Sequence, residues 1–167
     1  GVVGENAAVI ATGMKGKVYV IDKSRERLKQ LNEMFGDKII PTESDKTDLK
    51  NLVSKCDLLI GGVLIPGAEA PKLVTKEMIK TMKRGSVVVD VAIDQGGCIE
   101  TSKPTTHANP TFLVDDVVHY CVANMPGGVP RTSTMALNKA TLPLLIKLAD
   151  QGYKKTLQEN KNYLAGL

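Results

Sequence analysis

The first 22 residues of the chain, GVVGENAAVIATGMKGKVYVID, decide its fold. Gly1 and Gly4 precede a segment in which apolar residues recur at helical spacing, and Gly13 and Gly16 predict where that helix ends. The residues that follow, KVYVID, are typical of a short strand. A helix followed by a glycine break and a strand is the repeating unit of α/β folds.

Helical and strand-like segments alternate along most of the chain. Ser24 predicts the N-cap of a second helix, and Gly36 predicts its end. The run LLIGG is continuously apolar, as expected of a parallel strand covered on both faces. We therefore predict an α/β fold with a doubly wound, Rossmann-type parallel sheet, whose central strand is expected before Gly1. Further strands are expected at residues 38–40, 58–62 and 86–91, with helices near residues 49–53 and 75–82.

The pattern changes after residue 97. Apolar runs at residues 111–114 and 117–122 predict the last strands, and a loop rich in proline and glycine follows them. Residues 132–150 predict a long helix, bent at Pro143. We expect a dinucleotide-binding domain at residues 1–130, and a C-terminal helical segment at residues 131–167 that joins a substrate domain.

Composition argues against several classes of protein. The net charge of +4 is spread along the helical segments, and aromatic residues make up only 4% of the chain, which does not indicate nucleic-acid binding. No stretch approaches the ~18 apolar residues of a membrane span. The three cysteines are far apart without C-x-x-C spacing, so we expect reduced thiols in a cytoplasmic protein and no metal site.

Gly1, Gly4 and Asp22 are the first candidate cofactor residues. G-x-x-G spacing at a helix start lets the backbone approach a pyrophosphate, although the same spacing also serves plain packing. Asp22 stands eighteen positions after Gly4, near the offset of about 20 for an acid that binds a ribose. An aspartate there can also be a turn residue. Arg27 could lie over an adenine, neutralise a 2′-phosphate, or simply face solvent.

Asp94 is the strongest candidate for a catalytic residue. It follows a predicted strand at the edge where ligands bind in doubly wound folds, and Gly96 and Gly97 leave room beside it. Asp90 lies four residues earlier, and the composition of the segment does not choose between the two acids. His107 and His119 stand in no recognisable motif, so we expect neither to be a general base.

Several long motifs together resemble the L-alanine dehydrogenase family. They are residues 89–97 (VDVAIDQGG), 63–71 (VLIPGAEAP), 123–126 (ANMP) and 130–134 (PRTST). The likeness covers essentially the whole chain. Nicotinamide nucleotide transhydrogenase has a related domain, but its counterpart of residues 92–94 carries a different acid.

The resemblance implies NAD as the cofactor and Asp94 as the catalytic aspartate. It implies that the cofactor is bound along its whole length, from the adenosine to the nicotinamide. The implied binding residues are Gly1, Val2, Val3 and Gly4 at the pyrophosphate, Asp22 at the ribose, Arg27, Ser44, Val63 and Leu64 at the adenosine end, Lys103, and at the nicotinamide end Val91, Ala92, Ile93, Asp94, Val122, Ala123, Asn124 and Met125.

The implied reaction is reversible oxidation of L-alanine to pyruvate and ammonium, by a homo-oligomer that is often a hexamer. The family's substrate-binding arginine and lysine and its catalytic histidine are expected upstream of Gly1, so we expect a chain truncated at both ends. Besides the transhydrogenase-like domain, two alternatives remain open. One is a dehydrogenase for another amino acid, and the other is a non-catalytic nucleotide sensor built on the same fold.

Overall fold

The computed structural model describes residues 1–44, 48–63, 65 and 69–166. The chain divides into two units, residues 1–123 and residues 124–167. The division lies before the boundary at residue 130 expected from the sequence, and the assignment of the two parts to cofactor and substrate binding stays a prediction.

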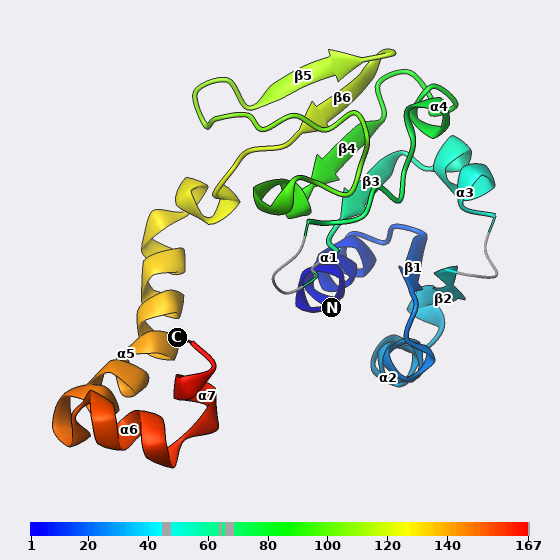
Figure 1. Ribbon diagram of the computed structural model, residues 1–167. Helices are drawn as coiled ribbons and strands as arrows, with labels where there is room; N and C mark the ends of the chain where they lie inside the picture. Colours follow the sequence, from blue (N-terminus) through cyan, green and yellow to red (C-terminus); the bar gives the residue numbers. More distant parts are fainter. Residues whose placement is uncertain (45–47, 64, 66–68, 167) are drawn as a thin grey trace. The chain divides into compact units, whose positions relative to one another are not determined.

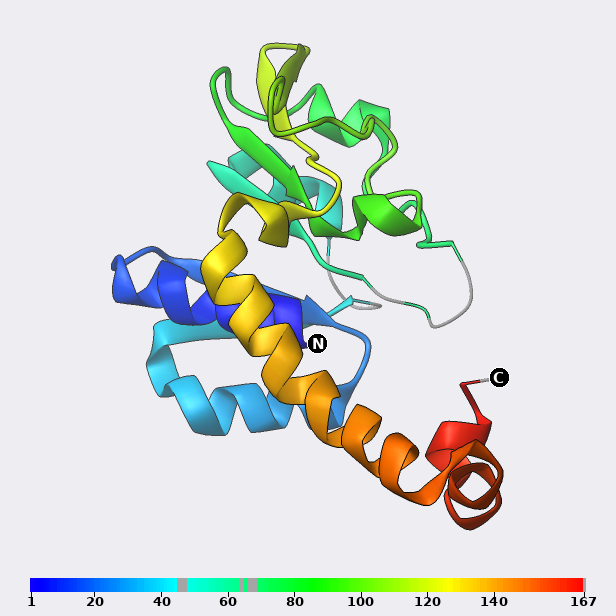
Figure 2. The same cartoon turned by 90° about the vertical axis from the view of Figure 1, so that its left-hand side faces the viewer.

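A two-stranded parallel sheet opens the first unit. Strand β1 pairs with β2, and helices α1 and α2 pack on one face of the pair, where Ala8, Leu31 and Ile39 are buried together. Figure 2 shows these two helices side by side. The elements are α1 (Val2–Gly13), β1 (Val18–Asp22), α2 (Arg25–Phe35), the 3₁₀ turn η1 (Gly36–Lys38) and β2 (Ile39–Glu43).

Local signals predicted most of these bounds. The Ser24 hydroxyl caps α2 by accepting a hydrogen bond from the Arg27 amide at 3.1 Å, and Gly36 ends that helix with a positive φ of 60°, both as predicted. Gly13 is the last residue of α1 and Met14 caps the helix, also as predicted. The strand expected at residues 38–40 was placed too short, since β2 continues to Glu43. Pro41 lies inside β2, where its missing N–H is tolerated because β2 is an edge strand.

The second sheet of this unit has the strand order β3-β4-β6-β5 (Figure 1). Strands β3, β4 and β6 are parallel, and β5 pairs antiparallel with β6. Helices α3 and α4 contribute Val53, Ile79 and their neighbours to a core with Val88 and Val117 of the sheet. The bounds are α3 (Leu49–Lys55), β3 (Leu58–Gly61), α4 (Lys76–Ile79), β4 (Val87–Asp90), η3 (Val91–Gln95), β5 (Thr111–Val114) and β6 (Val117–Tyr120).

These elements confirm the α/β class with mostly parallel strands. Among the described residues the strands form two sheets rather than one, and β1 and β3 are each at a sheet edge. Helix α1 connects the sheets because it contacts both β1 and β3 (Figure 1). Parallel pairing with intervening helices is what the alternating pattern predicted.

The second unit is helical. Tyr163 joins its helices by donating a hydrogen bond from its hydroxyl to the Leu144 carbonyl at 3.0 Å, and Ser133 joins η4 to α5 through the Pro126 carbonyl at 2.7 Å. No helix within the described part of the chain is long and apolar enough to span a membrane. The elements are η4 (Met125–Gly128), α5 (Pro130–Gln151), α6 (Tyr153–Glu159) and α7 (Lys161–Leu164).

Candidate functional site

Most of the predicted cofactor residues of the first unit lie at the carboxyl end of a parallel strand or at the start of α1, whereas Arg27 lies in α2 and Lys103 in the loop before β5. Asp22 ends β1, Ser44 follows β2, and Val63 closely follows β3. The segment containing Asp94 begins directly after β4. Ligands of doubly wound folds bind at this edge. Leu64 lies outside the described residues, and Asn124 and Met125 belong to the second unit.

The start of α1 lies against the carboxyl ends of both sheets. The backbone nitrogen of Gly1 is 3.5 Å from Asp22 Oδ2, at the end of β1. Beyond β3, a Cβ placed on Gly62 would come within 2.8 Å of a Val3 methyl carbon, so the Val3 side chain of α1 packs directly against this glycine. At Gly1 and Gly4 an added Cβ would meet nothing within 4 Å. The first helical turn is therefore open on its glycine side.

Asp22 has two roles in this geometry. Its Oδ1 accepts a hydrogen bond from the Ser24 amide at 2.9 Å, which stabilises the turn into α2. Its Oδ2 faces the start of α1, and the side chain is 27% exposed, so a ligand can still reach it. Asp22 can therefore stabilise the turn and bind a ligand at the same time.

Arg27 is not a solvent-facing arginine. Its guanidinium Nη2 forms an ion pair with the Glu5 carboxylate of α1, and Nη1 donates to Gln30 Oε1 at 3.0 Å. Only 26% of the Arg27 side chain is exposed. The arginine therefore ties α2 to α1, and Glu5 already neutralises the charge that a 2′-phosphate would need. The sequence analysis missed Glu5, because nothing local connects two residues so far apart in the chain.

Asp90 and Asp94 differ in exposure and in hydrogen bonding. Asp94 is exposed in η3, and no hydrogen bond or ion pair to its carboxylate occurs among the described residues. Asp90 is 0% exposed and accepts hydrogen bonds from three backbone amides of the segment after β4. A substrate can therefore reach Asp94 but not Asp90.

Several residues predicted at the nicotinamide end have buried side chains. Ala92, Ile93 and Val122 are 8%, 6% and 0% exposed, so only their main chain is available to a ligand. Val91 is half-buried, whereas Ala123 and Lys103 are exposed. Around Val122 the backbone is fixed by Thr105, whose amide donates to the Cys121 carbonyl and whose carbonyl accepts from Ala123.

The histidines and cysteines do not form a reactive centre. His119 is fully buried, and burial lowers the pKa of its imidazole. Burial also raises the pKa of the Cys98 thiol, to about 12, with the nearby Asp90 charge acting in the same direction. The three cysteines are free. Within the described ranges, no group of three or more His, Cys, Asp or Glu residues could hold a metal ion.

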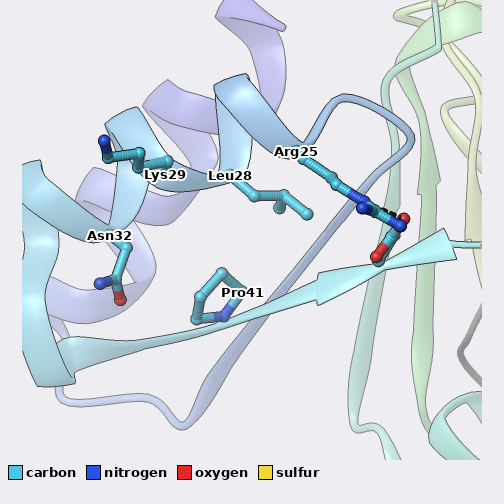
Figure 3. Close-up of a pocket in the computed structure, with 6 residues that line it drawn as sticks. Arg25, Leu28, Lys29, Asn32 and Pro41 are labelled. Atoms are coloured by element: carbon cyan, nitrogen blue, oxygen red, sulfur yellow. Dashed lines mark hydrogen bonds and ion pairs between the residues drawn. The ribbon is translucent and has the colours of Figure 1, made fainter.

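An open depression lies elsewhere, between α2 and β2 (Figure 3). Leu28 and Pro41 form its floor, and an ion pair between Arg25 Nε and Glu43 Oε1 at 2.7 Å crosses one end. None of the predicted cofactor residues lines it. The lining residues are Arg25, Leu28, Lys29, Asn32, Pro41 and Glu43.

Comparison with known proteins gives a consistent result. The family model "Alanine dehydrogenase/PNT, C-terminal domain" matches residues 1–167. Alanine dehydrogenase of Halomonas elongata is 57% identical over 167 residues, which are 100% of this chain and 45% of that protein. A solved L-alanine dehydrogenase has a TM-score of 0.87 at 47% identity, over 99% of this chain and 45% of that one.

A more distant solved structure, the transhydrogenase from Sinorhizobium meliloti, has a TM-score of 0.78 at 28% identity, over 89% of this chain and 42% of its own. This chain thus spans a little under half the length of the relatives it matches. The carboxyl-edge site, the whole-chain match and the 57% identity agree, and the chain belongs to the alanine dehydrogenase/PNT C-terminal domain family.

Proposed function

We propose that the protein containing this chain is an NAD-dependent alanine dehydrogenase, which converts L-alanine reversibly to pyruvate and ammonium. The observation that carries the proposal is the position of the start of α1, at the carboxyl ends of both sheets, together with an exposed Asp94 just past β4. The names of the similar proteins support alanine as the substrate, because identity to alanine dehydrogenase is 57% and to transhydrogenase 28%.

The cofactor of this family is NAD, and the described residues fit a dinucleotide. The glycine side of the first turn of α1 is open to a pyrophosphate, and the helix N-terminus presents amides toward an anion. Asp22 stands beside that turn and would hold the adenosine ribose through the carboxylate of its side chain, which is 27% exposed. When bound, NAD would accept the hydride that leaves the α-carbon of L-alanine.

Asp94 acts on protons in this proposal. Its carboxylate is exposed just past the carboxyl end of β4, where the amino group of the substrate would lie. There it takes up or returns a proton as the amine becomes an imine and water adds. The neutral buried His119 does not share this task, since no ligand reaches it.

Assembly and location complete the proposal. We place the protein in the cytoplasm, which agrees with its three free cysteines. We also propose a homo-oligomer, a hexamer by family resemblance, in which the substrate domain or another subunit covers the exposed apolar side chains of α5.

The test is Asp94→Asn in the whole protein. We expect turnover of L-alanine with NAD to fall by roughly 10²-fold or more, the scale of a positioned proton-transfer group. NADH affinity, measured by fluorescence titration, stays nearly unchanged because the substitution removes no cofactor contact of the adenosine end. Asp57→Asn is the matched control, because Asp57 is an exposed aspartate at the opposite, amino end of β3. Full turnover in Asp94→Asn would remove Asp94 from the mechanism.

A further inference from the structure

The carboxylate of Asp90 ties together both ends of one segment, residues 91–99. Oδ1 accepts from the Ala92 amide at 3.2 Å, near the start of the segment, and from the Cys98 amide at 3.3 Å, near its end. Oδ2 accepts from the Ile99 amide at 3.1 Å. The Cys98 thiol adds a weaker donor at 3.5 Å from Oδ1. Asp94 lies in the middle of the segment that these bonds close.

The space around the carboxylate is shaped by two glycines. A Cβ on Gly97 would lie 2.7 Å from Asp90 Oδ2, and Gly97 has a φ of 75° that other residues rarely adopt. A Cβ on Gly61, the partner of Asp90 in the next strand, would lie 2.4 Å from the Cys98 sulfur. Larger residues at either position would displace the segment from the carboxylate.

A second contact holds the segment from the outside. The Lys72 ammonium donates hydrogen bonds to the carbonyl oxygens of Gly96 and Gly97, the latter at 2.8 Å. The backbone amides of the segment thus point to a buried anion, and two of its carbonyls point to an exposed cation. Charge-assisted bonds of this kind are stronger than neutral ones.

We propose that Asp90 is a positioning residue for Asp94: its buried carboxylate fixes the path of residues 91–99 and so sets where the Asp94 carboxylate stands. The inference rests on the proposed function, since it assigns Asp94 a reacting substrate. Asp90 itself touches no ligand. It acts through the main chain of η3, and Lys72 supports it at Gly96 and Gly97.

Asp90→Asn is the sharpest variant because it is nearly isosteric. An amide has one acceptor oxygen, so its NH₂ group would face one of the backbone amides that the carboxylate now satisfies. A buried donor would then be left without an acceptor. We expect kcat to fall by about 10²-fold, the effect of misplacing a reacting group by roughly 1 Å, with NADH affinity nearly unchanged.

A double-mutant cycle separates positioning from general damage. If Asp90 acts only through Asp94, Asp90→Asn lowers kcat in the parent protein but not further in the Asp94→Asn background. Ser86→Ala is the control, because Ser86 is also buried, precedes β4 at its other end, and loses a hydrogen bond to the Cys56 carbonyl. We expect it to leave kcat unchanged. Lys72→Met should lower kcat, and Lys72→Arg should restore most of it.

Hydrogen–deuterium exchange gives a readout that does not need activity. We expect the amides of residues 92–99 to exchange faster in Asp90→Asn than in the parent or in Ser86→Ala, with β3 and β4 unchanged. Absence of alanine-dependent NADH formation in the parent would overturn the proposed function. The exchange measurement would still test whether Asp90 fixes residues 91–99, because it does not depend on activity. Unchanged exchange in residues 92–99, or equal losses from Asp90→Asn in both backgrounds, would overturn the present inference.

Discussion

Asp90 and Asp94 show how burial divides the roles of two acids in one short motif. The buried carboxylate has all of its bonds inside the protein, and the exposed one is left for a ligand. Removing a carboxylate from water is costly unless donors replace the water, so a buried aspartate almost always holds something in place. Asp22 lies between these extremes, with one oxygen used by a turn and the other accessible.

Cofactor choice is predicted from Asp22, Arg27 and Glu5. We expect tighter binding of NADH than NADPH, because the Asp22 carboxylate repels a 2′-phosphate and Arg27 is already paired with Glu5. Asp22→Ser should lower the ratio of the NADPH Kd to the NADH Kd by on the order of tenfold, which corresponds to about 1.4 kcal/mol. Adding Glu5→Gln should narrow it further by releasing the Arg27 guanidinium. Fluorescence titration with both reduced cofactors measures each step.

The control for this series is Asp37→Ser, which removes an exposed aspartate from η1 and should leave the preference as it was. Equal affinity of the parent protein for the two cofactors would exclude the role proposed for Asp22.

Among the elements, β6 carries His119, whose neighbours fix both the packing of its ring and the tautomer that it adopts. His119 stacks on Phe112 of β5 with ring centroids 5.1 Å apart. Its Nδ1 is 3.0 Å from the Val117 carbonyl oxygen, so Nδ1 carries the proton and Nε2 accepts from the Thr101 hydroxyl at 2.8 Å. This neutral tautomer satisfies both nitrogens, and burial lowers the imidazole pKa although the Asp90 charge acts against the shift.

Stability is therefore predicted to depend on pH through His119. An unfolded histidine titrates near pH 6.5, above the lowered pKa in the folded state. Unfolding then takes up a proton below about pH 6.5, so the stabilisation present above that pH is lost as the pH falls. One proton contributes at most about 1.4 kcal/mol per pH unit. Urea unfolding at a series of pH values in His119→Gln should lack this component.

His107→Gln provides the comparison, because His107 is exposed and its replacement should leave the pH dependence in place. If the pH profile of His119→Gln matched that of the parent protein, His119 would not be the group that titrates.

At the scale of the whole molecule, α5 is a long helix with little cover among the described residues. None of its residues is buried within the second unit, and Leu137 and Leu145 are 66% and 60% exposed. Apolar surface of this extent marks a contact surface in soluble proteins.

We predict that α5 contributes to subunit association. Sedimentation of the whole protein at micromolar concentration should show an oligomer, and Leu137→Asp with Leu145→Asp should shift it toward smaller species because buried charge is costly. Leu113→Asp is matched in exposure, at 67%, but lies on β5 and should not change the sedimentation. A parent protein that sediments only as monomer would contradict the proposal.

The amino-acid sequence by itself determined the order of the main helices and strands, the two ends of α2 and the class of the fold. These follow from local rules, since Ser24 and Gly36 bound α2 through contacts within a few residues. The cover expected on both faces of β3 was wrong among the described residues, because β3 is an edge strand in which Leu58 and Ile60 are 51% and 37% exposed. The sequence also singled out Asp22 and Asp94, because the pattern along the chain placed Asp22 at the end of a strand and Asp94 just past the end of another.

Only the tertiary structure decided what depends on residues distant in the chain. Pro41 lies in a strand because β2 has a single neighbour, and Arg27 is neutralised because α1 brings Glu5 to it. Asp90 proved to be the anchor rather than the exposed acid, because the chain returns at Cys98 and Ile99 to present its amides to the same carboxylate. Spacing along a chain records which residues share an element, but the partners of a buried charge are set by packing.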